Sequence, residues 1–509
     1  MGFLSTVPSD ERSNAHEVGH DQYISTTVYG SALAACEFPR FEMREEEMPA
    51  RTAARFVHDE LLMDGSPALN LASFVTTYME DEAERLMLEN LSKNFIDVEE
   101  YPALGEIESR CVNMIARLFN APLDTPEAEA LGVSTIGSSE AIILSVLAAK
   151  RRWQNARKAA GKPYDKPNLV MNSAVQVCWE KAARYLEVEE RYLYCTSERF
   201  VIDPKEAVDL VDENTILVCA ILGSTYTGEY EDVQGLNDLL QAKNEKEGLD
   251  VHIHVDAASG GFVAPFVNPQ LLWDFRVPLV CSINVSGHKC DLAYAGVGWA
   301  LWRSKAFLPE EILFTVNYLG SPQVSFTLNF SKSAVQVIGQ YYQLLRLGKS
   351  GYRAIMTNLT ETADYLAESV VKFAGGDKFV LMSKTGGEGL PLVAWRLKNQ
   401  EHYDEFSIAR QLRARGWIVP AYTMAPHSDK LKLLRVVVRE DFSRSRCETF
   451  IRDLTAAVKF LDNAPKEVVE HLAQTKLPQS HTAANKSHKH HHHEKHSLAG
   501  QHDKTHGVC

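Results

Sequence analysis

The sequence predicts an α/β protein in which a large domain, built on a mostly parallel sheet, is followed by a smaller α+β domain. Short β-branched runs alternate with helical patterns between residues 167 and 302, which is typical of parallel strands covered by helices on both faces. A second set of strands and helices begins near residue 350. The chain has 509 residues, of which 45% are hydrophobic and 24% charged, and is long enough for both domains.

The first 69 residues are predicted to form an arm ahead of the large domain. Residues 1–55 are polar and only weakly periodic, and therefore indicate irregular structure. Helical patterns then dominate up to about residue 120. They are clearest in "MEDEAERLMLENLSKNF" (79–95) and "GEIESRCVNMIARLFNA" (105–121), where apolar residues recur at the spacing of helical turns.

The large domain is assigned to residues 70–355. Helices are expected at 175–186 and 233–248, and a further helix opens at "TIGSSEA" (135–141). The runs between them are short and rich in valine, isoleucine and aromatic residues, which favours buried strands. Strands are expected at 167–172, 191–195, 215–222, 251–256, 280–286 and 296–302.

The small domain is assigned to residues 356–468. A long helix at 351–374 leads into it, and a final helix runs through residue 463. Between them the pattern predicts strands at 378–384, 391–397 and 433–438, with one helix at 406–416.

Residues 469–509 form a histidine-rich tail that we expect to be disordered. His488 and the run 490–493 would bind a divalent metal only adventitiously, and no catalytic metal is expected. The tail lacks tryptophan and an amphipathic basic helix, which calmodulin requires of a target helix. Calmodulin is therefore not an expected partner.

The charge and cysteine content limit the possible partners and compartment. A net charge of −14 argues against a nucleic acid or an anionic membrane as partner. The start fits the loose myristoylation pattern through Gly2 and Thr6, but no basic patch follows to support membrane binding. The nine cysteines are scattered, without C-x-x-C pairs, as in proteins of a reducing compartment. We expect a cytoplasmic protein.

Side chains that could take part in catalysis or ligand binding lie at two predicted strand ends and at the start of one predicted helix. Asp256 ends the run "VHIHVD", and His288 and Lys289 follow "SINVSG". Ser138 and Ser139 open a helix whose first N–H groups and dipole suit a phosphate. Ligands bind beyond the carboxyl ends of strands in such sheets. A phosphate cradle, a carboxylate and a lysine together fit pyridoxal phosphate, with the lysine as Schiff-base partner and the carboxylate on the pyridine nitrogen.

Each of these features also has an ordinary structural explanation. A serine pair that opens a helix is often only an N-cap, and an aspartate after a strand often caps the next turn. Most lysines are solvated surface charges. The functional interpretation depends on their combination in one domain.

Longer motifs point the same way. The chain resembles the pyridoxal-phosphate-dependent group II decarboxylases, and among them the glutamate decarboxylases of plants, fungi and bacteria. The resemblance covers residues 35 to 465 and rests on "LNLASFVTTYMEDEA", "KNFIDVEEYP", "TIGSSEA", "VQVCWEKAARY", "HVDAASGGFVAPF", "INVSGHK" and "RGWIVPAYTM". It implies an aspartate-aminotransferase-like (type I) fold. It also implies an arm engaged in oligomer contacts and a homo-oligomer (a dimer, or a hexamer of dimers) whose active sites are shared between chains.

The resemblance also implies roles for individual residues. Lys289 would be the Schiff-base lysine, His288 its neighbour at the phosphate and ring, and Asp256 the partner of the pyridine nitrogen. The remaining cofactor contacts would come from Ser138, Ser139, Gln176, Thr225 and Ala258. The implied reaction is α-decarboxylation of L-glutamate to 4-aminobutyrate and carbon dioxide.

Substrate recognition and proton transfer are implied in the same way. Ser73, Asn94 and Asp97 match positions that receive the distal carboxylate, and Arg435 matches the arginine that orients the α-carboxylate. Protonation at Cα would come from Tyr318 or His288, although Tyr318 would equally serve as a packed loop aromatic.

One departure concerns the residues after the lysine, where the family usually has an aromatic residue and then glycine. Cys290 and Asp291 stand there instead, and this predicts backbone strain and a carboxylate that shifts pKa values beside the cofactor. Two alternatives follow: a decarboxylase or lyase acting on an aromatic or other small amino acid or a sulfinate, or a catalytically silent homologue with a scaffold or metal-binding role.

Overall fold

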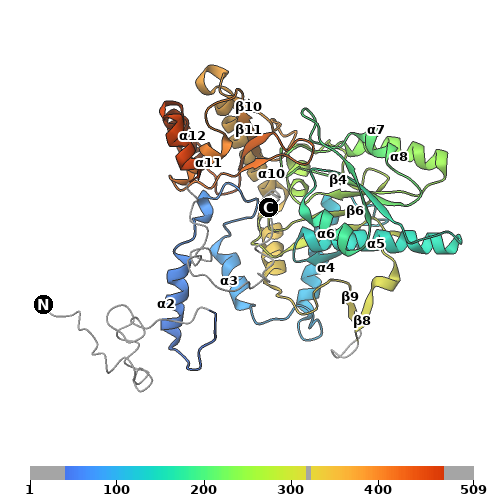
Figure 1. Ribbon diagram of the computed structural model, residues 1–509. Coiled ribbons are helices and arrows are strands. Elements are labelled where there is room, and N and C mark those ends of the chain that lie inside the picture. The colour runs from blue at the N-terminus through green and yellow to red at the C-terminus, as the bar shows by residue number, and fades with distance from the viewer. Residues whose placement is uncertain (1–40, 317–322, 475–509) are drawn as a thin grey trace, which may run out of the picture. The chain divides into compact units, whose positions relative to one another are not determined.

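The structure is a computed structural model that describes residues 41–316 and 323–474 (Figure 1). The chain divides into two compact units, Met1–Ser66 and Pro67–Cys509. The predictions made for Gly2, Tyr318 and the histidine-rich run lie outside the described residues. The predicted domain boundaries at 69, 355 and 468 stay predictions.

In the first unit, helix α2 (Ala50–Leu61) begins after Pro49, earlier than the helical pattern predicts. An ion pair one turn apart, with Arg55 Nε 3.0 Å from Asp59 Oδ2, supports it.

The second unit contains a seven-stranded sheet in the order β1-β7-β6-β5-β4-β2-β3, which confirms the predicted large α/β domain (Figure 1). Strands β3, β2, β4, β5 and β6 are mutually parallel, whereas β7 is antiparallel to both β6 and β1. Strand β4 is buried along its whole length, as expected for a strand covered on both faces. The strands are β1 (Leu131–Thr135), β2 (Asn168–Asn172), β3 (Glu189–Leu193), β4 (Thr215–Ile221), β5 (Ile253–Asp256), β6 (Val280–Val285) and β7 (Gly298–Trp302).

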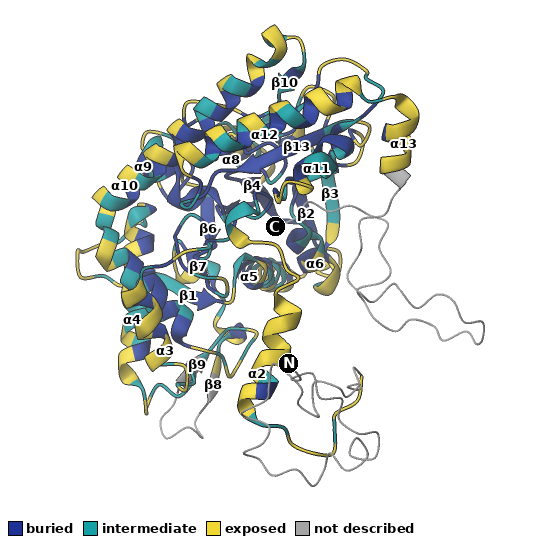
Figure 2. Ribbon diagram, turned by 90° about the vertical axis from the view of Figure 1, so that its left-hand side faces the viewer, coloured by how far each residue is buried: buried dark blue, intermediate teal, exposed yellow. Residues whose placement is uncertain are grey.

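Helices cover both faces of this sheet, and its five inner strands are buried along their whole length, whereas the edge strands β1 and β3 are only partly buried (Figure 2). Helix α5 packs against β4, β6, β7 and helix α6, while α4 packs against β1 and β7. The helices of this part are α3 (Asp81–Glu89), α4 (Pro102–Leu118), α5 (Ser138–Ala159), α6 (Val177–Tyr185), α7 (Pro204–Asp209), α8 (Val233–Glu247) and α9 (Ala264–Val267).

A second, antiparallel sheet in the order β10-β11-β13-β12 forms the predicted small α+β part. Helix α10 (Val335–Val371) contacts both α4 and β11 and so connects the two sheets, with a break at Gly348. A two-stranded ribbon of β8 (Phe314–Val316) and β9 (Gln323–Ser325) precedes it. The other elements are β10 (Phe379–Leu381), β11 (Leu392–Leu397), α11 (Glu405–Arg413), β12 (Ala421–Thr423), β13 (Lys432–Val437), α12 (Arg444–Asn463) and α13 (Lys466–Gln474).

Among the described residues, no helix combines the length and apolar character needed to cross a bilayer. In the same residues, no three His, Cys, Asp or Glu side chains cluster as metal ligands would.

Candidate active site

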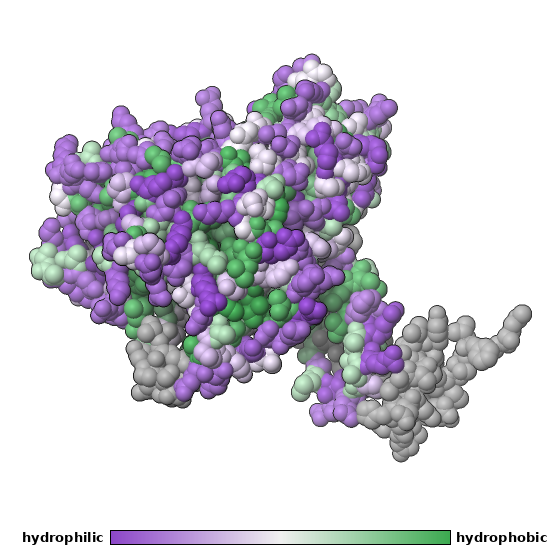
Figure 3. All heavy atoms as spheres, turned by 180° about the vertical axis from the view of Figure 1, so that it is seen from behind, coloured by the Kyte–Doolittle hydropathy of each residue, from purple (hydrophilic) through white to green (hydrophobic). Residues whose placement is uncertain are grey.

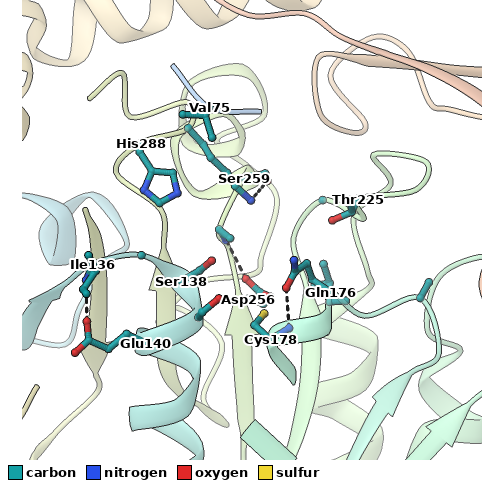
Figure 4. Close-up of a pocket in the computed structure, with 17 residues that line it drawn as sticks. Val75, Ile136, Ser138, Glu140, Gln176, Cys178, Thr225, Asp256, Ser259 and His288 are labelled. Atoms are coloured by element: carbon teal, nitrogen blue, oxygen red, sulfur yellow. Dashed lines mark hydrogen bonds between the residues drawn. The ribbon is translucent and has the colours of Figure 1, made fainter. Parts of the chain in front are cut away.

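A cavity of about 370 Å³ lies where β1, β4, β5 and β6 end and where α5 and α6 begin (Figure 4). These strand ends share one edge of the sheet because the four strands point the same way. Every residue that the sequence predicts as a cofactor contact lines the cavity: Ser138, Ser139, Gln176, Thr225, Asp256, Ala258, His288 and Lys289.

Lys289 lies in the turn that follows β6 and is not a solvated surface residue. Only 9% of its surface is exposed, and its Nζ lies 3.1 Å from Ser259 Oγ. The carbonyl oxygen of Lys289 accepts a hydrogen bond of 2.7 Å from Thr76 Oγ1, which fixes the backbone of this turn. The lysine amine is thus held at a defined point of the cavity wall.

His288 faces the start of α5 across the cavity. A Cβ atom at Gly137 would come within 2.9 Å of His288 Cε1, so only glycine allows this approach. Burial, together with the charge of Lys289, lowers the pKa of His288 to about 4. The imidazole is therefore neutral at physiological pH. Its Nδ1 is buried and has no hydrogen-bond partner among the described residues.

The start of α5 offers free donors to the cavity. Gly137 is the N-cap residue of this helix, and no side chain in the described structure caps it. The first N–H groups of an α-helix have no partner within the helix, and the helix dipole adds positive potential there. Ser138 and Ser139 are thus not simple caps, and their hydroxyls and N–H groups border the cavity together.

Asp256 ends β5 and has a complete set of donors around it. Trp179 Nε1 donates to its Oδ2 at 2.8 Å, whereas Asn284 Nδ2 and the Ala258 N–H donate to Oδ1 at 2.9 and 3.1 Å. The residue is 5% exposed. Three donated hydrogen bonds fix the direction of the Asp256 side chain.

The other predicted cofactor contacts lie around these groups. Gln176 is the N-cap of α6, and its Oε1 accepts a hydrogen bond of 2.7 Å from the Cys178 N–H. Thr225 lies in the loop after β4, and its carbonyl oxygen accepts a hydrogen bond from Arg435. Ala258 follows the end of β5, where its small side chain leaves room for a flat ring.

The residues predicted to bind substrate do not line this cavity. Ser73 lies close to it, since its Oγ accepts a 3.1 Å hydrogen bond from the N–H of the lining residue Val75. Arg435 is 1% exposed and donates to the Ala72 and Thr225 carbonyls. Asn94 and Asp97 contact each other, with Nδ2 and Oδ1 3.3 Å apart.

Asp291 does not bring the strain or the charge that its sequence position suggests. It is absent from the described residues with positive φ, whereas the next residue, Leu292, has φ 67°. Asp291 is fully buried, and neither carboxyl oxygen has a hydrogen-bond partner in the described structure. Burial raises its pKa well above the ordinary value, although Lys289 acts in the opposite direction. Burial thus favours the protonated, neutral form of this side chain in the folded protein.

Several residues of the site were not singled out from the sequence. Trp179 and Asn284 hold Asp256, and Ser259 contacts the lysine amine. Glu140 shapes the turn before α5, because its two oxygens accept the N–H groups of Ile136 and Leu328, each at 2.8 Å. The sequence feature that could have identified such residues is a polar residue inside an otherwise apolar run, such as Asn284 in "SINVS".

These residues fit pyridoxal phosphate. The start of α5 suits the phosphate, Lys289 can bind the aldehyde, and the held carboxylate of Asp256 suits a protonated ring nitrogen. The unpartnered Nδ1 of the neutral His288 leaves one polar atom that a ligand can satisfy.

Comparisons with known proteins agree with this geometry. The family model described as the pyridoxal-dependent decarboxylase conserved domain matches residues 46–398. Glutamate decarboxylase 1 of Arabidopsis thaliana is 53% identical over 459 residues, which are 90% of each chain. Glutamate decarboxylase of Aliivibrio fischeri is 44% identical and covers 86% of this chain and 93% of its own. The solved glutamate decarboxylase of Lactobacillus brevis superposes with a TM-score of 0.81 at 41% identity, covering 86% of this chain and 98% of its own.

Three findings lead to the same assignment: the family match over most of the chain, the relatives that are about half identical, and the cavity lined by every predicted cofactor contact. The chain belongs to the pyridoxal-dependent decarboxylases.

Proposed function

We propose that this chain removes the α-carboxyl group of L-glutamate and releases carbon dioxide and 4-aminobutyrate. The observation that carries the proposal is the meeting of a buried lysine, a held carboxylate and a helix start in one cavity. The choice of glutamate is supported by relatives named glutamate decarboxylase that align over most of both chains.

The chemistry divides between the cofactor and the protein. When bound, pyridoxal phosphate supplies an electron-poor ring that accepts the electron pair of the breaking bond between Cα and the carboxylate. Lys289 would hold the cofactor through its amine. Asp256 would lie next to the ring nitrogen and favour its protonated form. The small Ala258 would leave room for the ring.

His288 and Tyr318 are the candidates for protonating Cα once carbon dioxide has left. The lowered pKa of His288 leaves its imidazole neutral, and a neutral imidazole is a weak acid. We therefore propose Tyr318 as the donor and His288 as a group that packs against the ring and contacts the phosphate.

Recognition of the substrate is assigned to the two ends of glutamate. We propose that Arg435 binds the α-carboxylate and thereby sets the breaking bond perpendicular to the ring. This role requires Arg435 to exchange a carbonyl contact for the substrate. Ser73 would contact the distal carboxylate through its hydroxyl from the segment next to the cavity.

The distal subsite is proposed to be shared between two copies of the chain. Asn94 and Asp97 do not line the cavity of their own chain. This position is expected for residues that contribute to the cavity of a second copy of the chain. Large hydrophobic side chains are exposed on the neighbouring segments, including Leu88 and Leu91, and hydrophobic patches interrupt the hydrophilic surface in Figure 3. We propose a homo-oligomer built from such dimers.

A complementation experiment tests the shared subsite. Lys289→Ala and Asp97→Ala variants are each expected to be inactive, but a co-expressed mixture should regain activity. A hybrid dimer then contains one cavity with both an intact Lys289 and an intact Asp97 from the other chain. A mixture that stays inactive, although mass spectrometry shows hybrid dimers, would refute the shared subsite.

The direct test of the reaction is to incubate the purified chain with pyridoxal phosphate and single amino acids. We expect carbon dioxide from glutamate and far less from aspartate, tryptophan or cysteine sulfinate. Release mainly from tryptophan would select the aromatic alternative. Cofactor binding without turnover of any of these would select the silent homologue.

The state of the cysteines supports a proposal for the cellular compartment of the protein. The free cysteines of the described residues are nearly all buried, and none of them forms a disulfide. This usage suits a reducing environment, and we propose the cytoplasm. Calmodulin is proposed not to be a partner, because the tail sequence lacks the helix that it binds.

A further inference from the structure

A row of polar side chains runs through the middle of the large sheet, behind Asp256. His254 and Asp256 lie two residues apart on β5 and so share a face, as do Ser282 and Asn284 on β6. The two strands are in a register that pairs His254 with Ser282 and Asp256 with Asn284. All of them are buried, with His254 and Asn284 at 0% exposure. We call these four residues the polar ladder.

Short hydrogen bonds connect the polar ladder from end to end. Ser282 Oγ lies 2.7 Å from His254 Nδ1, and His254 Nε2 lies 2.7 Å from Asn284 Oδ1. Asn284 Nδ2 in turn donates to Asp256 Oδ1 at 2.9 Å. Each distance lies within the normal range of a hydrogen bond.

The direction of every hydrogen bond follows from the carboxylate. An ionised carboxylate only accepts, so Asn284 must present its NH2 group to Asp256 and its oxygen to His254. His254 must then carry its proton on Nε2. Burial lowers the pKa of His254, so the ring is neutral and its Nδ1 accepts from the Ser282 hydroxyl. All donors in the row thus point towards Asp256.

The row orients groups rather than conducting protons. The amide of Asn284 neither gains nor loses a proton at physiological pH, and it interrupts any path from His254 to Asp256. What His254 can do is decide which end of that amide faces the carboxylate. If the amide turned over, its oxygen would face Asp256 and repel the carboxylate.

A purely structural role does not account for this arrangement. On the same face, Cys219 and Ile221 of β4 pair in register with His254 and Asp256 and are buried, so small and apolar side chains fit this face of the sheet. Buried polar groups are costly unless every one is satisfied, and here three are placed in sequence behind Asp256, which borders the cavity.

We propose that His254 is a positioning residue for the decarboxylation: through its Nε2–H it fixes the amide of Asn284, which in turn holds the side chain of Asp256 aimed at the ring nitrogen of the cofactor. The role in turnover rests on the proposed function, whereas the orientation of the ladder does not.

The first test needs no substrate. It is made on the unmutated enzyme, and a variant serves only to assign the signal. Solid-state NMR of the cofactor-loaded enzyme with 15N-labelled histidine reports the protonation of each ring nitrogen, and the signal missing in His254→Phe identifies His254. We expect a protonated Nε2 and an unprotonated Nδ1. A proton on Nδ1, or on both nitrogens, would overturn the proposal whether or not glutamate is the substrate.

The second test separates positioning from packing. His254→Phe keeps an aromatic ring against Trp179, whose ring centroid lies 5.3 Å from that of His254, but removes both nitrogens. We expect kcat to fall roughly tenfold to a hundredfold, as for the loss of one hydrogen bond to a charged group, with KM within about twofold. The 15N signal of labelled cofactor should move towards the unprotonated ring nitrogen.

A double-mutant cycle and a matched control complete the test. If His254 acts through Asn284, the double variant His254→Phe/Asn284→Leu should be no slower than Asn284→Leu alone. His252→Phe changes a nearby histidine outside the ladder, which contacts the Asp250 carbonyl at 3.2 Å, and should leave kcat and the ring nitrogen unchanged. Additive losses, or a ring nitrogen that stays protonated in His254→Phe, would overturn the proposal.

Discussion

Replacing Asp291 with asparagine removes a titrating group from a fully buried position, and we expect the folded protein to become more stable at neutral pH. The carboxyl group has no hydrogen-bond partner among the described residues, and burial raises its pKa well above the ordinary value. Its neighbours do not compensate: Tyr352 Oη, at 2.8 Å, and Gln340 Nε2, at 3.2 Å, both donate to the backbone carbonyl of Asp291 instead.

The sign and size of the effect follow from linkage. The folded state keeps Asp291 protonated to a higher pH than the unfolded chain, whose aspartates titrate near about pH 3.9. Stability from this group is therefore complete below that pH and is lost as the pH rises towards the folded pKa. The loss is about 1.4 kcal/mol for each pH unit that separates the two pKa values. A buried neutral carboxyl without a partner costs about 1–3 kcal/mol in addition.

The assay is the thermal midpoint of the cofactor-saturated enzyme as a function of pH, for the parent, Asp291→Asn and Asp291→Ala. Below about pH 4 the asparagine variant should match the parent, because both carry a neutral polar group there. Towards pH 8 the parent should lose stability relative to both variants, and the alanine variant should be the most stable if the small cavity costs less than the unpaired group. The comparison cancels other titrating groups, such as Glu231, whose pKa burial raises to about 7. Three parallel pH profiles would refute the assignment of a neutral, buried Asp291.

Three further changes test the site and the tail. Asp256→Asn should keep the cofactor but lower turnover on the order of a hundredfold. The reason is that an amide carries no charge for the ring nitrogen and cannot accept hydrogen bonds from all three donors. A rate within a few-fold of the parent would contradict the role assigned to Asp256. Cys290→Tyr with Asp291→Gly should leave kcat equal or higher, since the buried acid is neutral, and a large loss would show that the pair is used. Truncation after Gln474 should leave turnover unchanged and reduce binding to immobilised nickel. Neither the full chain nor the truncated chain should respond to calcium–calmodulin, and activation of the full chain alone would contradict this expectation.

The sequence predicted six of the seven strands of the large sheet, because strands buried on both faces leave continuous apolar runs. Strand β1, which is only partly buried, was not predicted. Strand β4 lies inside the predicted run 215–222 and β6 inside 280–286. The direction of β7 was not available from the sequence, because an antiparallel buried strand has the same composition as a parallel one. The predicted helix at 351–374 corresponds to the part of α10 that follows the break at Gly348, whereas the helical segment that begins at Val335 before this break was not predicted.

The site was predictable where a reactive residue directly follows an apolar run, as at Asp256 and Lys289. The polar ladder was harder to find, because a histidine inside a strand usually indicates only a satisfied core residue and its partner lies on another strand. The roles proposed for Asn94 and Asp97 would depend on a second copy of the chain. Neither the periodicity of one sequence nor the cavity of one chain contains that information.

The central claim is that Lys289 serves a cavity that decarboxylates glutamate at Cα, and isotope labelling tests it most directly. The enzyme is incubated with pyridoxal phosphate and L-glutamate labelled with 13C at the α-carboxyl carbon, and the released gas is analysed by mass spectrometry. We predict labelled carbon dioxide in a one-to-one ratio with 4-aminobutyrate from the parent, and neither product nor the visible absorbance of lysine-bound cofactor from Lys289→Ala. Unlabelled gas, no gas from the cofactor-loaded parent, or normal turnover by Lys289→Ala would contradict the account.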